Sequence, residues 1–471
     1  MPVAEQPRPG LREGMFHETA TPEGREATSP AQLREAVQSL ARSTVLVVGD
    51  AMVDRYVYGS VNRVSPEAPV PVLSVEREVA LPGGAGNVVR NLTALGAAAA
   101  FVSVVGDDAP GSDLTGLIGG QPRVEPWLLV QGGRATTVKT RFLAAGQHLL
   151  RTDHEQPAPI HPRLADRMVK IASDAVAATT VLVLSDYGKG VLAGEIPARL
   201  IAAARAAGRR VVVDPKGGDH GRFAGADLII PEPAELAKAT CLAVGNETEV
   251  AAAALELLKA HDFGAVLVPR GADGLTLAEA SGVKHFRAEA SEMHDPAGGG
   301  DAVVAVVAAG LATGLSLSAA ARLAALALGI VSRKAGIALV HSDELLEALA
   351  AGHGAMRKLV SLPLAIEVTE RWRHRGWRVG YLQASLPCPE TLTEQARRLC
   401  DRLLVGVPDQ EAASSLLADR PEIDLIAICS PGEEMLRLLR PDVMVAPGDA
   451  TEDATLAHLL GEWGGELRAA E

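Results

Sequence analysis

The chain has 471 residues, of which 48% are hydrophobic and 22% are charged, so it is long enough for two domains with sizeable apolar cores. A formal net charge of -13 argues against a protein that coats nucleic acid, and no apolar run is long and uncharged enough to span a bilayer, so we expect neither partner. Four cysteines without metal-ligand spacing indicate reduced thiols, and the expected location is the cytoplasm.

The N-terminal residues are rich in Pro, Glu, Gly, Thr and Arg and show no periodicity. Such a composition buries little apolar surface, so residues 1–40 are expected to form a disordered or loosely docked tail. Ser29 is placed to cap a short helix over about 30–42. We expect a larger domain over 41–355 and a smaller one over 356–471, because a Gly-His-Gly break at 352–354 ends the pattern of the larger domain.

The larger domain alternates short apolar runs with Ala-rich helical stretches, which predicts an α/β fold with a parallel sheet. Polar residues just past the strand ends should then line a site at the carboxyl edge of this sheet. Asp50, Asp186, Asp214, Lys216 and Glu235 qualify by position. The predicted buried strands are 44–50, 99–105, 181–187, 210–217, 228–231 and 265–268.

A proline-rich stretch follows the first strand. Pro66, Pro69 and Pro71 exclude a helix and allow only edge strands or an extended flap. Two further segments, 136–141 and 147–153, have polar side chains at alternate positions and are predicted to be strands.

Two glycine-rich turns stand before predicted helices. One, at 81–87, opens a helix that runs to about Leu95. The other, Asp295–Asp301, precedes the apolar run Ala302–Leu311, and its three consecutive glycines favour a curl of inward N–H groups that holds an anion. Asp301 lies at the mouth of this anion site, where a carboxylate suits a base that takes a proton from a hydroxyl attacking a phosphoryl group.

The smaller domain repeats the alternation of strands and helices. Its four predicted buried strands are 377–382, 401–407, 423–428 and 442–446. We therefore expect a second α/β domain of Rossmann-like type.

The two glycine-rich stretches, Gly83–Asn87 and Asp295–Asp301, resemble in order the two signatures of the ribokinase-like (PfkB) sugar kinases. Four other stretches are similar to the kinase half of the bifunctional bacterial heptose-7-phosphate kinase/heptose-1-phosphate adenylyltransferases, whose nucleotidyltransferase domain occupies the place of 356–471. These stretches are 49–56, 63–72, 185–190 and 214–217.

The resemblance implies an ATP- and Mg²⁺-dependent kinase that phosphorylates the anomeric hydroxyl of D-glycero-D-manno-heptose 7-phosphate, a step toward ADP-heptose and the lipopolysaccharide core. Asp301 would be the general base, and the amides of Gly298, Gly299, Gly300 and Asp301 would form the anion hole. A homodimer is the expected assembly.

The resemblance also assigns binding roles. Asp54, Gly84 and Asn87 would hydrogen-bond the sugar, and Asp186 joins the substrate-binding set by its position. The phosphates of the sugar or of ATP would be bound by Lys139, Arg141, Arg151 and Lys216. ATP would also contact Glu235, Arg270 and Gly271. Mg²⁺ would be held through water, with Glu235 as the candidate residue.

The second domain departs from the nucleotidyltransferases. Leu386 and Pro389 stand where that family has its two phosphate-binding histidines, and Ala446 replaces a lysine. Neither Leu nor Pro can donate a side-chain hydrogen bond to a phosphate, so the resemblance implies that the fold persists without adenylyl transfer. In the kinase domain, Glu232 replaces the usual Asn of an N-x-x-E motif, which leaves the nucleotide preference open.

Three alternatives stay open. The substrate could be another sugar or sugar phosphate, since the motifs do not fix the hydroxyl pattern. The chain could be a non-catalytic scaffold or sensor, given the altered motifs. It could also remain a bifunctional kinase and adenylyltransferase with an unfamiliar second site.

Overall fold

The structure is a computed structural model that divides into two compact units, Met1–Leu345 and Leu346–Glu471. Our predicted boundary falls in 351–358, which lies outside the described residues. None of the described helices is long and apolar enough to cross a membrane. The structure describes Arg25 and residues 29–144, 147–288, 298–332, 334, 338–350, 359–374, 377–384, 388–416, 420, 422–429, 432–447 and 454–470.

The first unit is built on a sheet with the order β13-β12-β11-β10-β9-β8-β1-β4-β5 among the described residues. Neighbours from β11 to β5 run parallel, and β12 and β13 extend the edge antiparallel. The predicted α/β fold with a parallel sheet is confirmed. The strands are β1 (Thr44–Gly49), β4 (Ala98–Gly106), β5 (Val124–Gln131), β8 (Val181–Ser185), β9 (Arg210–Asp214), β10 (Leu228–Ile229), β11 (Ala265–Pro269), β12 (Leu275–Glu279) and β13 (Gly282–Phe286).

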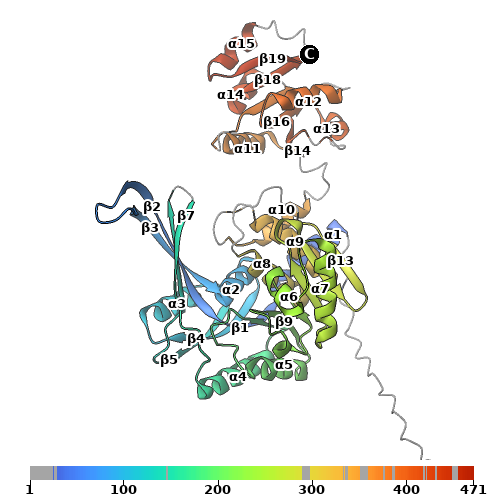
Figure 1. Ribbon diagram of the computed structural model, residues 1–471. Coiled ribbons are helices and arrows are strands. Elements are labelled where there is room, and N and C mark those ends of the chain that lie inside the picture. Colours follow the sequence, from blue (N-terminus) through green and yellow to red (C-terminus); the bar gives the residue numbers. More distant parts are fainter. Residues whose placement is uncertain are drawn as a thin grey trace, which may run out of the picture. The chain divides into compact units, whose positions relative to one another are not determined.

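Helices cover both faces of this sheet, with α2 and α8 on one side and α4 and α5 on the other (Figure 1). Alternate side chains of β1 explain this, since Leu46 and Val48 join the core on the α4 and α5 side, while Val45 and Val47 are buried on the opposite face. The helices are α1 (Pro30–Ser39), α2 (Ala85–Ala94), α3 (Ala109–Gly119), α4 (Pro162–Val176), α5 (Ile196–Ala206), α6 (Pro233–Thr240), α7 (Glu247–Ala260), α8 (Gly299–Ala312), α9 (Leu317–Val331) and α10 (Ser342–Ala350), the last of which contains the division between the units.

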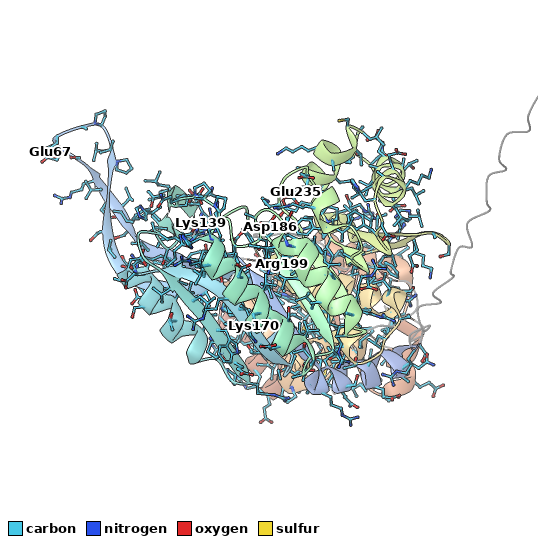
Figure 2. The ribbon with its side chains drawn as sticks, turned by 90° about the horizontal axis from the view of Figure 1, so that it is seen from below. Glu67, Lys139, Lys170, Asp186, Arg199 and Glu235 are labelled. Carbon is cyan, nitrogen blue, oxygen red and sulfur yellow. The ribbon has the colours of Figure 1, made fainter. Side chains whose placement is uncertain are left out.

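A second sheet, ordered β3-β2-β6-β7, forms the flap. The β2–β3 hairpin carries Pro66, Pro69 and Pro71 at and beside its turn, in the stretch for which we predicted edge strands or a flap. Figure 2 shows Glu67 at the far end of this hairpin. The helix predicted to open within 81–87 begins at Ala85, because β3 stays paired with β2 as far as the Ala51 and Gly84 partners. The strands are β2 (Ala51–Val64), β3 (Pro71–Gly84), β6 (Val138–Ala144) and β7 (Gln147–His154).

The apolar run Ala302–Leu311 is a buried helix, as predicted, and forms most of α8. Every residue of this run is buried because α8 packs against the sheet, α2 and α9. Gly298 precedes the helix in a left-handed conformation with φ of 84°. Asp295, Pro296 and Ala297 lie outside the described residues.

The second unit is also α/β. Its sheet has the order β14-β17-β16-β15-β18-β19 in the described part of the chain, and all of its pairs are parallel. The four predicted strands are β15 (Val379–Gln383), β16 (Arg402–Val407), β17 (Leu425–Ile428) and β18 (Val443–Pro447), and the sequence did not reveal β14 (Leu359–Val360) and β19 (Glu466–Ala470). The helices are α11 (Leu362–His374), α12 (Glu390–Arg398), α13 (Gln410–Leu416), α14 (Glu433–Leu439) and α15 (Ala454–Gly461).

Candidate active site

Asp301 lies in the first turn of α8 and is held at both carboxylate oxygens. Nδ2 of Asn87 donates to Oδ2 at 2.6 Å, and the phenol of Tyr187 donates to Oδ1 at 2.5 Å. Burial raises the pKa of Asp301 to about 6, although these two hydrogen bonds oppose the rise. The carboxyl group is therefore ionised at neutral pH and is a stronger base than an exposed aspartate.

Asn87 is itself held by a buried arginine on the same helix. Nη1 of Arg90 donates to Oδ1 of Asn87 at 3.0 Å, and Arg90 is only 8% exposed. This contact fixes the amide so that its nitrogen faces Asp301. We expected Asn87 to contact the sugar, and this stays a prediction, because its amide nitrogen and oxygen each retain one hydrogen-bonding position beyond the contacts to Asp301 and Arg90.

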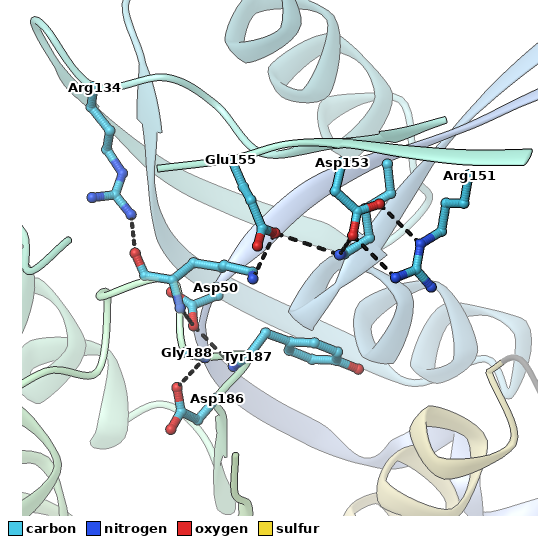
Figure 3. A network of polar contacts seen from close by, with 10 residues as sticks. Asp50, Arg134, Arg151, Asp153, Glu155, Asp186, Tyr187 and Gly188 are labelled. Carbon is cyan, nitrogen blue, oxygen red and sulfur yellow. Dashed lines mark hydrogen bonds and ion pairs between the residues drawn. The ribbon is translucent and has the colours of Figure 1, made fainter. Parts of the chain in front are cut away.

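The loop after β8 is anchored by Asp50, at the end of β1. The buried carboxylate of Asp50 accepts the backbone N–H groups of Tyr187, Lys189 and Val191 at 2.9 to 3.0 Å. Figure 3 shows Asp50 beside the backbone of Tyr187. Asp50 thus has a structural role in the described structure, whereas we predicted only that it lies at the sheet edge.

A cavity of about 260 Å³ opens above Asp301 at the carboxyl edge of the sheet. Figure 2 shows Lys139, Asp186 and Glu235 along this edge. The cavity gathers most of the predicted site residues, namely Asp54, Gly84, Lys139, Arg141, Arg151, Asp186, Lys216, Glu235, Gly298, Gly300 and Asp301. We refer to it as the acceptor cavity.

One wall of the acceptor cavity carries a row of cations and carboxylates from the flap and the β8 loop (Figure 3). Nζ of Lys139 lies 2.9 Å from Asp153 and 3.5 Å from Glu155. Nζ of Lys189 lies 2.6 Å from Glu155, and Nε of Arg151 lies 3.0 Å from Asp153. Of this row, Lys139 and Arg151 line the cavity itself, and the two cations suit a phosphate group.

Two aspartates of the acceptor cavity have arginine partners. Asp54 pairs with Arg141, and Asp186 pairs with Arg222. Burial nevertheless raises the pKa of Asp186 to about 6, assisted by the charge of Asp50.

The opposite wall is acidic apart from one lysine. Nζ of Lys216 lies 2.9 Å from Glu235 and 3.7 Å from Glu232. Burial raises the pKa of Asp214 well above its usual range, and the charges of Asp301 and Glu235 act in the same direction. Among the described residues, no group of three His, Cys, Asp or Glu side chains is arranged to hold a metal ion.

A second cavity, of about 470 Å³, borders the start of α8 at Gly299 and Gly300. It is lined by Arg270, Gly271, Gly299 and Leu328, and it shares Glu232, Pro269 and Gly300 with the acceptor cavity. Arg270 is tied to Glu247 at 2.8 Å. The two cavities therefore meet at the start of α8, beside Asp301, as phosphoryl transfer between two substrates requires.

Sequence reasoning did not give Tyr187, Arg90 or Lys189 a role in the site. Tyr187 and Lys189 belong to the quoted stretch 185–190, so the motif pointed to the loop but not to the side chains that turn inward. Arg90 carried no signal, because an arginine inside a helix is usually exposed.

The changed motifs of the second unit are described in part. Pro389 precedes α12, and Ala446 is in β18. Leu386, together with 448–450, lies outside the described residues.

Comparison with known proteins yields close relatives along the whole chain. A family model described as pfkB family carbohydrate kinase matches residues 42–343. The Bifunctional protein HldE of Acidiphilium cryptum (strain JF-5) is 52% identical over 459 residues, which cover 93% of this chain and 94% of the relative. The Bifunctional protein HldE of Paramagnetospirillum magneticum (strain ATCC 700264 / AMB-1) is 44% identical over 470 residues, covering 94% and 96%.

Solved structures show the same fold in the first unit. Arabidopsis thaliana ribokinase, complexed with ribose and ATP, aligns with a TM-score of 0.53 at 20% identity and covers 65% of this chain and 98% of that chain. Phosphofructokinase-2 from Escherichia coli, in complex with substrates and products, aligns with a TM-score of 0.55 at 18% identity and covers 65% and 98%.

Proposed function

The chain belongs to the pfkB family of carbohydrate kinases and is an ATP-dependent sugar kinase, and on this premise we propose that it phosphorylates the anomeric hydroxyl of D-glycero-D-manno-heptose 7-phosphate. The observation that carries the proposal is the meeting of two cavities at Gly300, with Asp301 beneath the acceptor cavity. Lys139 and Arg151, which line the acceptor cavity, support a phosphorylated acceptor, because cations there can pair with a phosphate group.

In the proposed reaction, Asp301 takes the proton of the anomeric hydroxyl as its oxygen attacks the γ-phosphorus of ATP. The bond from the γ-phosphorus to the β,γ-bridging oxygen breaks, and ADP leaves with that electron pair. The N–H groups at the start of α8, from Gly299 to Asp301, stabilise the charge on the transferred group, helped by the positive end of the helix. The product is the 1,7-bisphosphate, which precedes ADP-heptose.

The residues near the meeting point suit Mg²⁺. Glu232 borders both cavities and Glu235 borders the acceptor cavity, and carboxylates are the oxygen ligands that Mg²⁺ takes in proteins. Bound Mg²⁺ would neutralise charge on the ATP phosphates. Glu235, with Glu232, would hold the ion through water, and Lys216 would then turn from Glu235 toward a phosphate.

The test of the kinase proposal follows labelled phosphate from ATP to heptose 7-phosphate. Asp301→Asn should lower the rate by about 10²–10⁴-fold, the usual contribution of a positioned general base. Asp166→Asn, on the exposed surface of α4, is the matched control and should retain full activity. Label that moves equally well in Asp301→Asn would overturn the assignment of the base, and label that moves only to another sugar would replace the substrate.

We also propose that adenylyl transfer has been lost from the second unit, because Leu386 and Pro389 stand in place of two phosphate-binding histidines. The competing function is a chain that is still bifunctional, and the relatives named bifunctional, which match over 93% of this chain, favour it. Incubation with heptose 1-phosphate and ATP separates the two. Release of pyrophosphate would establish the bifunctional reading, and its absence, with kinase activity intact, would support the loss.

We further propose a cytoplasmic homodimer joined through the flap. Val64, Val70 and Val75 of the flap hairpin and Leu150 of β7 are 51 to 64% exposed, which is unusual for apolar side chains on one small sheet. Light scattering after gel filtration should give twice the chain mass for the protein and a single mass for Val64→Asp. A monomeric wild-type protein would overturn this proposal.

A further inference from the structure

We propose that Tyr187 makes the base Asp301 selective for a sugar hydroxyl over water, and so suppresses hydrolysis of ATP when no sugar is bound. The inference rests on the proposed role of Asp301 as the base. It adds a specificity-determining residue to the reaction, and its test does not require the identity of the sugar.

The first support is the contact itself. The Tyr187 hydroxyl donates to Oδ1 of Asp301 at 2.5 Å, while Oδ2 accepts from Asn87 at 2.6 Å. Asp301 is only 9% exposed, so both oxygens are capped by protein donors and little of the carboxylate faces the cavity. Burial and the neighbouring Asp301 charge raise the pKa of Tyr187 well above its usual range, so the phenol stays protonated and acts as the donor.

The second support is that Tyr187 is fixed from two sides. Its backbone N–H donates to Oδ2 of Asp50 at 2.9 Å, and Figure 3 shows the ring extending away from that anchor. The ring lies over Gly84, where an added Cβ would be 3.4 Å from Cδ2 of Tyr187. Gly84 thus borders the ring at van der Waals distance, and with the Asp50 anchor this contact directs the phenol at Asp301.

The third support is the surrounding volume. The acceptor cavity of about 260 Å³ has room for several water molecules when no sugar is present. A water molecule that lost a proton to Asp301 could attack the γ-phosphorus, which would break the bond to the bridging oxygen and release ADP and phosphate. This hydrolysis would waste ATP, and the Tyr187 hydroxyl occupies the carboxylate oxygen on which such a water would be oriented.

A sugar phosphate can displace the phenol where water cannot. A single water molecule reaches only the groups next to the base, so it gains little to offset the lost Tyr187 hydrogen bond. A sugar phosphate gains contacts to Lys139 and to Asp54 in the cavity. The binding energy of these contacts can offset the loss of the Tyr187 hydrogen bond when the sugar hydroxyl replaces the phenol at Asp301. The phenol thus favours an acceptor that is held elsewhere in the cavity.

The experiment compares ADP formation without sugar in the wild type and in Tyr187→Phe, both as full chains with ATP and Mg²⁺. The variant should hydrolyse ATP about tenfold faster, the effect expected when a hydrogen bond to a charged group no longer competes. Adding Asp301→Asn to Tyr187→Phe should abolish this hydrolysis. Tyr58→Phe, which removes a phenol from β2 outside the cavity, is the control and should leave hydrolysis unchanged.

Hydrolysis without sugar that stays at the wild-type level in a folded Tyr187→Phe variant would overturn the proposal, as would a rise that persists with Asp301→Asn. Thermal melting establishes that the variant folds, and Tyr187→Leu serves as the second variant if it does not. Failure of the proposed function has a different signature, because there the wild type would transfer no phosphate to any sugar phosphate whatever the hydrolysis rates are.

Discussion

Nδ2 of Asn87 lies 2.6 Å from Oδ2 of Asp301, although the two residues are 214 positions apart in the chain. The contact joins the start of α2 to the start of α8, so the two glycine-rich turns of the sequence meet in one site. One turn faces the flap that borders the acceptor cavity, and the other provides the N–H groups beside the second cavity. The asparagine therefore couples the proposed base, Asp301, to the part of the site that we propose binds the acceptor.

The first prediction concerns the pH dependence of catalysis. Asp301 must be ionised to act as a base, and its pKa is about 6, so kcat/KM should fall on the acid side with a midpoint near pH 6. The Asn87 hydrogen bond lowers this pKa, so Asn87→Leu should move the midpoint to higher pH and reduce kcat. Asp186 has a pKa of about 6 as well, and a limb that does not move in Asn87→Leu would belong to Asp186 instead.

The same carboxyl group links stability to pH. Its pKa is about 6 in the folded chain against a usual value of 3.8, so the folded state binds the proton more tightly. Asp301 therefore favours folding most strongly below about pH 4, and this contribution is lost as the pH rises through 6. Between pH 5 and pH 8, the unfolding free energy of the wild type should fall by about 1 kcal/mol relative to Asp301→Asn. Parallel urea titrations measure this difference, and equal pH dependence in both proteins would contradict it.

The third prediction concerns Arg90. Arg90→Met removes the donor that orients Asn87 and leaves Oδ1 of Asn87 unpaired in a buried place. We expect a loss of about 1–3 kcal/mol of stability and a lower kcat with little change in KM, because the base is misoriented and the acceptor contacts remain. Arg167→Met on the exposed surface of α4 controls for the loss of an arginine. If Arg90 had a purely structural role, Arg90→Met would lower the stability and leave the acid side of the pH profile of kcat unchanged.

The fourth prediction contrasts two glycines of the site. Among the described residues outside its own helix backbone, a Cβ on Gly300 would meet no atom within 4 Å, so Gly300→Ala should fold and melt as the wild type does. It should still lower activity, because the methyl group would project where the two cavities meet. Gly84→Ala should instead destabilise the chain, since Gly84 has φ of 57° and its Cβ would lie 2.6 Å from the Asp50 carbonyl oxygen. Melting curves with kinase assays distinguish the two effects.

The sequence predicted the elements whose pattern is local. The apolar run Ala302–Leu311 and the strand ending at Gly49 could be read directly, because burial on all sides leaves an uninterrupted apolar signal. The β12 and β13 hairpin was missed because each strand has only five residues, and a run that short gives little pattern. The start of β2 was missed because Ala51 follows β1 after a single residue.

The site shows the same limit. Motifs placed Asp301 and the glycines, but the partners of a side chain depend on contacts between distant elements. The signature predicted that Asn87 binds sugar, but it gave no sign of the contacts that its amide makes with Arg90 and Asp301. Tyr187 had no signal of its own, since its role arises only when the β8 loop is tied to Asp50.

The last prediction addresses the phosphate of the sugar. Lys139 lies between Asp153 and Glu155, and Lys189 shares Glu155 with it. A phosphate dianion entering the acceptor cavity can replace these carboxylates as the partner of the lysines. The ammonium group of a lysine can move toward the phosphate because its side chain is flexible. Lys139→Met should therefore raise KM for the phosphorylated sugar by about tenfold or more and change kcat little, since it removes binding common to the ground and transition states.

An unphosphorylated sugar provides the internal comparison for Lys139→Met, because its KM should be nearly unaffected by the loss of the lysine. Lys170→Met is the matched control, since Lys170 pairs with Asp174 on the exposed face of α4 and lies outside both cavities. Raising the salt concentration should weaken binding of the phosphorylated sugar more in the wild type than in Lys139→Met, because screening acts on the charge that the variant lacks. If Lys139→Met raised KM equally for both sugars, the lysine would be shaping the cavity and the phosphate would bind elsewhere.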